Sequence, residues 1–453
     1  MAEGSRGRRR LVVIGGDAAG MSAASQARRL DPDLEIVALE KGRWTSYSAC
    51  GIPYLVGGDV ATLEDLVARD PQTFRTQHNI DARTLHEAVS IDVDAKKVEV
   101  RDHEHGGRTY SLGYDVLHIA TGATPTRPKL EGIDSGAIHG VQTLEDAADL
   151  LHHAEHLGDG CKVVVVGGGY IGLEMAEAFV KRGAHTTVIT RTAQPLGMFD
   201  PDMGALIADA MRAEGVDLHT GTSATGFEKG KVHTNNGTLD ADLVVLGLGV
   251  GPNSKLAVDA GIEVGERDGI IVDRRQLTSA PDVYSAGDCC LAFHRLTGEQ
   301  VYVALGTVAN KMGRTAGTNI GGGYATFPGV IGTAVTKLCK LECARTGVNE
   351  KEARAAGFEF KSVTIESTTR AGYFPGAAPI KVKMLAEKRS GRVLGAQILG
   401  QEGAAKRIDV VATAITADFT VEEMTALDLS YAPPFSPVWD PVLIASRKLA
   451  ESL

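Results

Sequence analysis

The chain has 453 residues, 43% of them apolar, and a formal net charge of -10. This length exceeds one compact core and predicts about three domains at roughly 150 residues each. The negative charge argues against nucleic acid as a general partner, and the apolar stretch Leu11–Ile14 is too short for a secretory leader or a membrane span, so we expect a soluble, cytoplasmic protein.

The first 40 residues match the pattern of a dinucleotide-binding βαβ unit. Leu11–Ile14 is typical of a buried parallel strand, and Met21–Leu30 is expected to form a helix. A second strand is expected at Glu35–Leu39. The basic run Arg6–Arg10 before them is interpreted as a solvated N-terminus, with a targeting or nucleic-acid arm as the alternative.

A glycine-rich loop, Gly15–Gly20, joins the first strand to the helix. In a βαβ unit such a loop lets a pyrophosphate meet the helix N-terminus, and an acid about 20 residues further on, here Glu40, holds a ribose hydroxyl. Asp17 replaces the middle glycine of the strict fingerprint, so an unrelated βαβ turn stays open as an alternative. The candidate contacts are Gly15, Asp17, Ala18, Gly20 and Glu40.

Cys50 is a single thiol in the segment Ser46–Tyr54. It has no partner at the spacing of a Cys-x4-Cys pair, because Thr45 and Leu55 occupy those positions. Such a pair stores two electrons as an internal disulfide, whereas a lone thiol must store them as a sulfenic acid or as a mixed disulfide with a small thiol. The lone thiol therefore limits the candidate substrates to compounds that can oxidise it to a sulfenic acid or form a mixed disulfide with it.

The other cysteines show neither the spacing of a disulfide framework nor that of a zinc site. Cys289 and Cys290 are adjacent, and Cys339 and Cys343 could share a helix face. Neither pair has the His or Cys companions that zinc needs. We interpret these four as buried, inert thiols and expect no metal site.

A second βαβ pattern follows about 150 residues after the first loop. Val163–Val166 precedes a complete G-x-G-x-x-G motif, Gly167–Gly172, and the next strand, Thr186–Ile189, follows. That strand leads to Thr190 and Arg191, where an acid would mark NADH. An uncharged and a cationic residue favour the 2′-phosphate of NADPH, although a plain surface role for the arginine stays open. The candidate contacts are Gly167, Gly169, Gly172 and Arg191.

Two further segments fit nucleotide binding by their order in the chain. Ala120–Gly122 follows an apparent strand and leaves the first unit. Ala286–Asp288 ends a strand that resembles one delivering an aspartate to the ribityl chain of a flavin. The candidate contacts are Thr121, Gly122 and Asp288.

With both loops, Cys50, Ala120–Gly122 and Ala286–Asp288 in place, the chain resembles the pyridine nucleotide-disulfide oxidoreductases over nearly its whole length. The resemblance implies an α/β fold of glutathione-reductase type: two doubly wound Rossmann-like dinucleotide-binding domains and an α+β dimerisation domain. It places FAD on residues 1–125 and 252–326, NAD(P)H on residues 126–251, and the contacts of a homodimer on residues 327–453.

Within this family, the segments Tyr373–Gly376 and Tyr431–Pro437 resemble the single-cysteine branch, and coenzyme A disulfide reductases in particular. Val438–Pro441 is similar to the archaeal and thermophilic enzymes. No histidine follows His294, so the His-Glu acid–base pair of glutathione reductase is missing. The resemblance gives its place to Tyr373 and Tyr431, the latter reaching the neighbouring subunit, with packed tyrosines as the alternative.

The resemblance also assigns contacts for coenzyme A, whose phosphorylated adenosine end needs basic partners. They are Ser22, Gln26, Arg29 and Ser46. Exposed helix residues are the alternative for the second and third of these. Ala49 and Trp439 depart from some bacterial members, although archaeal-type members share the tryptophan.

These features predict a FAD-dependent NADPH:disulfide oxidoreductase, with NADH as a possible donor, that reduces coenzyme A disulfide through a mixed disulfide on Cys50. Gly51 would allow close approach of the flavin, and Pro53 suits a first helical turn. A helix N-terminus, nearby cations or the oxidised flavin would stabilise the thiolate. The alternatives are an NAD(P)H oxidase or peroxidase, a persulfide or sulfur reductase, and an electron-carrying flavoprotein.

Overall fold

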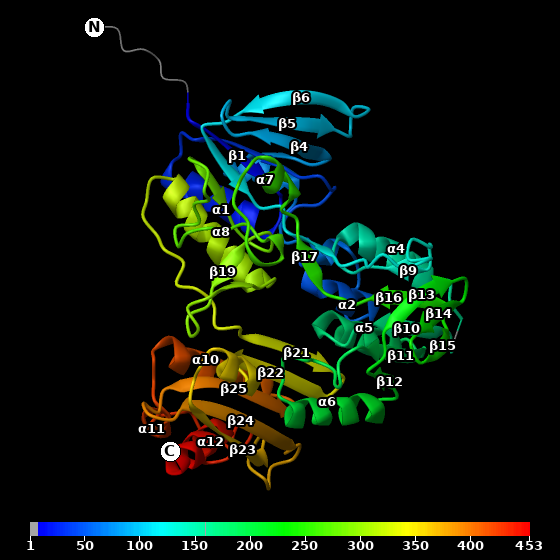
Figure 1. Ribbon diagram of the computed structural model, residues 1–453, viewed down its shortest axis with the longest axis vertical. Helices are drawn as coiled ribbons and strands as arrows, with labels where there is room; N and C mark the ends of the chain where they lie inside the picture. Colours follow the sequence, from blue (N-terminus) through cyan, green and yellow to red (C-terminus); the bar gives the residue numbers. More distant parts are fainter. Residues whose placement is uncertain (1–7, 159) are drawn as a thin grey trace.

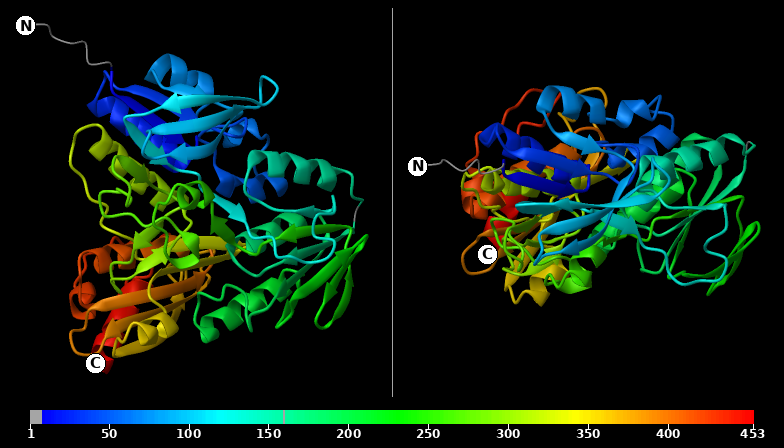
Figure 2. Two further views of the ribbon diagram at one scale, coloured as in Figure 1. Left: turned by 45° about the horizontal axis from the view of Figure 1, so that its top comes forward. Right: turned by 90° about the horizontal axis from the view of Figure 1, so that it is seen from above.

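The computed structural model describes residues 8–158 and 160–453. Figure 1 shows three bodies: the sheet with β1 lies toward one end of the long axis, the C-terminal sheet with β25 at the other end, and the part with β10 and β16 to the side; Figure 2 shows the same arrangement from two further sides. Part of the basic run Arg6–Arg10 lies outside the described residues. At its end Arg10 forms an ion pair with Glu35 at 2.8 Å.

The first Rossmann unit is a parallel sheet of order β18-β7-β1-β2-β3. Its strands are β1 (Arg10–Ile14), β2 (Glu35–Leu39), β3 (Asp81–Arg83), β7 (Val116–Ile119) and β18 (Val283–Ser285). Strand residues alternate between two apolar cores: Leu11 and Val13 face α1 (Ala18–Leu30), whereas Val12 and Ile14 face an antiparallel sheet. That sheet consists of β4 (His86–Asp92), β5 (Lys97–Asp102) and β6 (Arg108–Gly113).

The second Rossmann unit repeats this plan. Its parallel sheet has the order β12-β11-β10-β16-β9, which matches the first sheet strand for strand when β10 is set on β1. The strands are β9 (Ile138–His139), β10 (Lys162–Val166), β11 (His185–Thr190), β12 (Asp217–Thr220) and β16 (Leu243–Leu246). The helices are α4 (Leu144–Glu155), α5 (Tyr170–Lys181) and α6 (Pro201–Ala213), and a small sheet again precedes the fourth strand: β13 (Ala224–Glu228), β14 (Lys231–Thr234) and β15 (Gly237–Asp240).

Two short antiparallel strands, β8 (Ala123–Pro125) and β17 (Val250–Pro252), carry the chain into the second unit and back. The chain then adds helix α8 (Gly306–Ile320) to the first unit, where it packs along α1. Shorter elements complete this part of the chain: α2 (Ile52–Val56), α3 (Pro71–His78), α7 (Lys255–Asp259), β19 (Leu291–Phe293) and β20 (Gln300–Tyr302).

The C-terminal sheet is antiparallel, with the order β21-β22-β25-β24-β23. Helices α10 and α12 pack on it through an apolar core, and α6 of the second Rossmann unit lies beside it (Figure 1). The elements are β21 (Ala334–Leu338), β22 (Leu341–Gly347), α9 (Glu350–Ala355), β23 (Phe360–Thr368), β24 (Pro379–Glu387), β25 (Val393–Gly400), α10 (Ile408–Thr416), α11 (Val421–Thr425) and α12 (Pro441–Ser452).

This architecture confirms the predicted fold class, and the expected strands and helices lie where the patterns placed them. Helix α1 begins at Ala18, three residues before the expected start, because the glycine loop turns directly into it. In the described chain no disulfide involves Cys50, Cys289, Cys290, Cys339 or Cys343. The interpretation of four buried thiols was wrong for Cys339, which is half-buried in the turn between β21 and β22. No helix in residues 8–158 and 160–453 has the length and apolarity of a membrane span.

Helices α1 and α8 approach closely because glycines face alanines. A Cβ atom on Gly317 would lie 2.3 Å from the Ala23 carbonyl oxygen, which is below any ordinary contact. We therefore expect Gly317→Ala to lower stability by about 2 kcal/mol, despite the better helix propensity of alanine. The midpoint of thermal unfolding should fall. Gly306→Ala, at the start of the same helix with no atom within 4 Å of its Cβ, is the control, and an equal effect of both changes would contradict the packing argument.

Candidate active site

The first glycine loop closes tightly between β1 and α1. The Gly15 amide donates to the Leu39 carbonyl at 2.8 Å, and a Cβ atom on Gly20 would lie 1.9 Å from the Gly15 oxygen. Glu40 lies beside the loop, where its Oε2 accepts from the Gly16 amide at 2.8 Å. The structure therefore brings the predicted residues Gly15, Asp17, Ala18, Gly20 and Glu40 into one cradle.

The second glycine loop has the same geometry. The Gly167 amide donates to the Ile189 carbonyl at 2.8 Å, and a Cβ atom on Gly172 would lie 1.9 Å from the Gly167 oxygen. Gly169 immediately precedes α5 as its N-cap residue. The three predicted glycines thus lie around one helix N-terminus, as a dinucleotide pyrophosphate requires.

The two loops differ at the residue that follows the second strand. In the first unit a Cβ atom on Gly16 would meet the side chain of Glu40 at 2.8 Å; in the second, a Cβ atom on Gly168 would meet Thr190 at 3.1 Å. Thr190 therefore occupies the position that Glu40, the acid expected to hold a ribose, has in the first unit. The next residue, Arg191, is exposed.

The first Rossmann unit has the donor and acceptor set that FAD needs. The Asp288 Oδ1 is buried and has no hydrogen-bond partner among the described residues, and burial raises the pKa of this carboxyl to about 6. Burial and the charge of Glu40 raise the pKa of Asp17 to about 7. Carboxyls in this condition are suited to ligand hydroxyls. Thr121 and Gly122 lie alongside, where Asn253 donates to the Thr121 carbonyl at 2.9 Å.

The Cys50 loop is fixed to the first glycine loop. The Tyr47 amide donates to Asp17 Oδ1 at 3.2 Å, and the Ser46 amide donates to the Gly16 carbonyl at 3.0 Å. Ser46 adopts a φ of 47°, a left-handed conformation that costs a non-glycine residue energy and persists because its surroundings hold it. The exposed Cys50 side chain is thereby kept beside the predicted flavin cradle.

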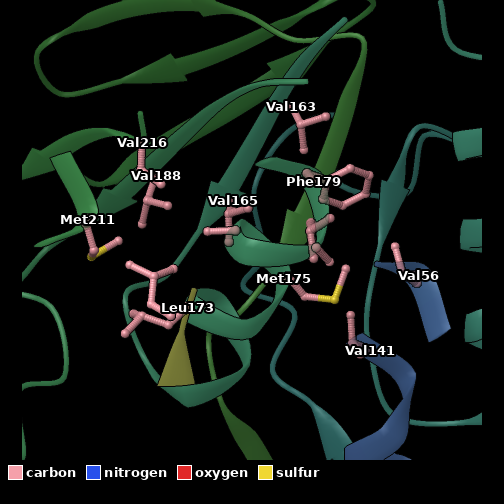
Figure 3. Close-up of a cluster of buried hydrophobic side chains, with 14 of the residues drawn as sticks. Val56, Val141, Val163, Val165, Leu173, Met175, Phe179, Val188, Met211 and Val216 are labelled. Atoms are coloured by element: carbon pink, nitrogen blue, oxygen red, sulfur yellow. The ribbon is translucent and has the colours of Figure 1, made fainter. Parts of the chain in front are cut away.

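Helix α2, which follows Cys50 directly, packs on the second Rossmann unit. Figure 3 shows Val56 and Val141 pointing toward Met175 of α5, in a core that continues through the second sheet. Pro53 lies in the first turn of α2, as expected. The missing side chain of Gly51 makes room for Leu66, whose Cδ2 would lie 2.3 Å from an added Cβ, so this glycine serves packing.

Carboxyl groups surround Cys50. Burial raises the pKa of the Cys50 thiol, and the negative charge of Glu174 raises it further. Burial also raises the pKa of Glu174 to about 7, although a hydrogen bond from Thr336 at 2.9 Å opposes the shift. Sequence reasoning missed Glu174; its signal is an acid inside the apolar first turns of α5.

The four predicted coenzyme A contacts lie on two elements. Ser22, Gln26 and Arg29 share one face of α1, because they are four and three residues apart. Ser22 donates to Asn310 Oδ1 of α8 at 2.7 Å, and Arg29 donates to Gln26 at 3.3 Å. Ser46 lies in the Cys50 loop. Asn310 was missed from the sequence, because only the packing of α1 on α8 brings it to this face.

Tyr373 and Tyr431 lie together on loops of the C-terminal sheet. Partial desolvation by the surrounding loops and the neighbouring Tyr373 raise the pKa of Tyr431, and the Ala371 amide donates to the Pro433 carbonyl at 3.1 Å, joining the two loops. Both tyrosines are exposed, Tyr373 at 78%. The hydrogen bonds of the described chain hold this pair to its own sheet, not to the Cys50 loop.

Two dinucleotide loops with an exposed, unpaired thiol, Cys50, between them indicate a nucleotide-dependent oxidoreductase. The chain belongs to the pyridine nucleotide-disulphide oxidoreductase family: the family model matches residues 9–313, and the model of its dimerisation domain matches residues 333–441. Membership implies FAD and NAD(P)H as cofactors and an NAD(P)H-dependent disulfide oxidoreductase activity.

Several relatives of the chain have names that refer to sulfur compounds or coenzyme A. It is 39% identical over 449 residues to a CoA-dependent NAD(P)H sulfur oxidoreductase of Pyrococcus furiosus, covering 98% of this chain and 99% of the relative. It is 30% identical over 438 residues to a coenzyme A disulfide reductase of Staphylococcus aureus, covering 94% and 96%. A solved NAD-dependent persulfide reductase from A. fulgidus superposes with a TM-score of 0.94 at 39% identity, covering 98% of this chain and 83% of that one.

Proposed function

We propose that the protein uses NADPH to reduce a disulfide of coenzyme A, through a mixed disulfide between Cys50 and one coenzyme A molecule. The observation that carries this proposal is the exposed Cys50 thiol beside the flavin cradle, in a loop that offers it no second cysteine. Two electrons can be stored there only with an external sulfur or with oxygen.

The atoms and electrons of this reaction balance with one thiolate, that of Cys50, and one hydride donor, NADPH. The Cys50 thiolate attacks one sulfur of the substrate disulfide, so that a Cys50–coenzyme A bond forms, the substrate bond breaks and one coenzyme A thiolate leaves and takes a proton. The first Rossmann unit would hold FAD, which would supply the transfer of two electrons from NADPH to this site. These electrons cleave the mixed disulfide, release the second coenzyme A thiolate and return Cys50 to its reduced form.

The shared face of α1 supports coenzyme A as the thiol. The helix starts at the Cys50 loop, where Asp17 accepts from Tyr47, and carries Ser22, Gln26 and Arg29 away from it. From Asp17 to Arg29 the helix advances roughly 18 Å at 1.5 Å per residue. A long thiol can therefore lie with its sulfur at Cys50 and its phosphates near Arg29, where the guanidinium forms charge-assisted hydrogen bonds.

The domain assignment forms part of the proposal. FAD would bind residues 1–125 and 252–326, NADPH residues 126–251, and a second copy of the chain residues 327–453. Exposed apolar side chains on the C-terminal part support the last assignment, because solvent alone rarely covers such a patch. They are Tyr373, Tyr431, Phe435, Val438 and Trp439. Light scattering on the purified protein should give the mass of a dimer.

Mass spectrometry of the protein as purified tests the proposal. We expect a coenzyme A adduct on the peptide that contains Cys50, removed by NADPH with release of one coenzyme A per chain. A Cys50 sulfenic acid together with rapid oxygen consumption would overturn the proposal in favour of an NAD(P)H oxidase or peroxidase.

Reduction of a coenzyme A persulfide is the second candidate. The names of the Pyrococcus furiosus and A. fulgidus relatives favour it, since one is CoA-dependent and the other a persulfide reductase. Cys50 would attack the inner sulfur, so that hydrogen sulfide leaves and the same mixed disulfide forms. Comparing kcat/KM for coenzyme A disulfide and coenzyme A persulfide separates the two candidates.

Tyr431 is proposed as the proton donor to the leaving thiolate, acting across the dimer. We expect Tyr431→Phe to lower kcat about 100-fold, which is the lower end for loss of a general acid, while the Cys50 adduct still forms. Steady-state kinetics and intact mass measure the two effects. Tyr324→Phe, which changes another exposed tyrosine outside the C-terminal sheet, should leave both unchanged. An unchanged kcat in Tyr431→Phe would rule out the assignment.

A further inference from the structure

A row of polar side chains crosses the C-terminal sheet where it meets the second Rossmann unit. Arg345 of β22 pairs with Gln397 of β25, Gln397 with Lys383 of β24, and Lys383 with Thr364 of β23. Paired residues share one face of a sheet, so these four side chains form one line, which we call the docking row. Three of them, Arg345, Gln397 and Lys383, are buried.

The docking row surrounds Asp200, which precedes α6 and is only 2% exposed. The Asp200 amide donates to Gln397 Oε1 at 2.8 Å, and Gln397 Nε2 donates back to Asp200 Oδ2 at 2.6 Å. Lys383 Nζ lies 3.2 Å from the same carboxylate oxygen and 2.8 Å from Asp202. A buried carboxylate needs such partners, so the sheet determines where Asp200 lies.

The chain segment before Asp200 covers the second glycine loop. The Leu196 amide donates to the Gly168 carbonyl at 2.7 Å, and Leu196 is fully buried with a φ of 45°. A branched side chain in the left-handed region is strained and stays there only when neighbouring contacts hold it. Leu196 packs in the apolar core of the second unit, and the docking row adds a contact two residues further on, where Arg345 donates to the Met198 carbonyl at 2.7 Å.

We propose that Gln397 and Lys383 are positioning residues for the nicotinamide dinucleotide. By holding Asp200 they fix the segment 192–199, and this segment holds Gly168 beneath the pyrophosphate and begins next to Arg191. The C-terminal sheet thus contributes to nucleotide binding without touching the nucleotide. The inference requires only the NAD(P)H use of the family and does not depend on the electron acceptor.

The test compares Gln397→Met and Lys383→Met in the FAD-loaded protein. We expect the Kd for NADP+, measured by calorimetry, and the KM for NADPH to rise about tenfold, because each change removes hydrogen bonds that hold the strained segment. Turnover at saturating NADPH and FAD content should stay within about twofold. Lys381→Met is the matched control: this lysine lies two residues away on the same strand and pairs with Glu366 of β23 at 2.7 Å.

An unchanged Kd in Gln397→Met, with a lower midpoint of thermal unfolding, would show that the docking row only ties the two units together and would overturn the proposal. The same conclusion would follow if Lys381→Met weakened NADP+ as much as the two docking-row changes. If Lys383→Met does not fold, the result for Gln397→Met alone tests the proposal, because that change leaves the charges around Asp200 unaltered. Because NADP+ binding needs no disulfide substrate, a failed coenzyme A assignment would leave this test intact.

Discussion

Replacing Cys50 by serine is expected to abolish disulfide reduction, with a loss of at least about 1,000-fold in kcat. A hydroxyl cannot form the mixed disulfide, and an alkoxide is a poor leaving group compared with a thiolate. The loop should keep its place, since its hydrogen bonds to Asp17 and Gly16 come from the backbone amides of Tyr47 and Ser46. FAD should therefore remain bound. Visible absorbance measures the flavin, and NADPH oxidation with coenzyme A disulfide measures turnover.

Cys343→Ser is a suitable control, because that thiol is buried in the core shared by the second Rossmann unit and the C-terminal sheet. Its turnover should stay near that of the unmodified chain. Full turnover in Cys50→Ser would favour a flavoprotein that passes electrons to a partner. Oxygen consumption that survives while disulfide reduction is lost would identify the flavin, not the thiol, as the site where oxygen reacts.

The charges around Cys50 add a pH-dependent expectation. Burial and Glu174 raise the pKa of the thiol, so the chain by itself disfavours the thiolate. Of the three stabilising sources expected from the sequence, nearby cations are replaced by carboxyls, and α2, at five residues, is short. The bound oxidised flavin is then the main candidate. Alkylation of Cys50 in flavin-free protein should accelerate only above pH 9, whereas FAD-loaded protein should react at lower pH.

The glycine loops could be predicted because each is a local pattern: strand, turn and helix follow one another within 30 residues. The position of the Cys50 loop against the first glycine loop could not be predicted. It depends on the left-handed conformation of Ser46 and on a hydrogen bond to Asp17, which in the sequence is only a departure from the fingerprint. Close approach of the flavin to Gly51 stays a prediction, with an ordinary loop-to-helix junction as the alternative. The contact of Gly51 with Leu66 could not be predicted, because Leu66 is 15 residues away in the chain.

Two residues of the docking row, Lys383 and Gln397, are visible in the sequence as polar residues within strands, but the residues near them in the chain do not explain them. Gln397 interrupts the otherwise apolar strand β25, and Lys383 is buried between Val382 and Met384 of β24. A buried polar residue must have a partner. The partner, Asp200, precedes these residues by almost two hundred positions and belongs to the second Rossmann unit, where it is the N-cap residue of α6. Pairing of this kind follows from how the units pack, so only the three-dimensional structure identifies it.

Replacing Arg191 by serine should lower kcat/KM for NADPH by about 30-fold and leave that for NADH within about twofold, because one charge-assisted hydrogen bond to a phosphate contributes roughly 2 kcal/mol. The double variant with Arg191→Ser and Thr190→Glu should prefer NADH to NADPH. In the first unit Glu40 occupies the matching position over Gly16, so the fold accommodates an acid there. Steady-state kinetics with both nucleotides measure the ratio.

Arg212→Ser is the control, since this exposed arginine of α6 pairs with Asp209 at 3.2 Å in the same unit but away from the glycine loop. Arg212→Ser should change kcat/KM for neither NADPH nor NADH. Equal losses for NADPH and NADH in Arg191→Ser would mean that the guanidinium contacts a part common to both, such as the pyrophosphate. A loss confined to NADPH would mean that the duplicated units differ in function at the end of their second strands: the first has Glu40, which is expected to hold a ribose, whereas the second has Thr190, followed by Arg191, which selects the phosphate.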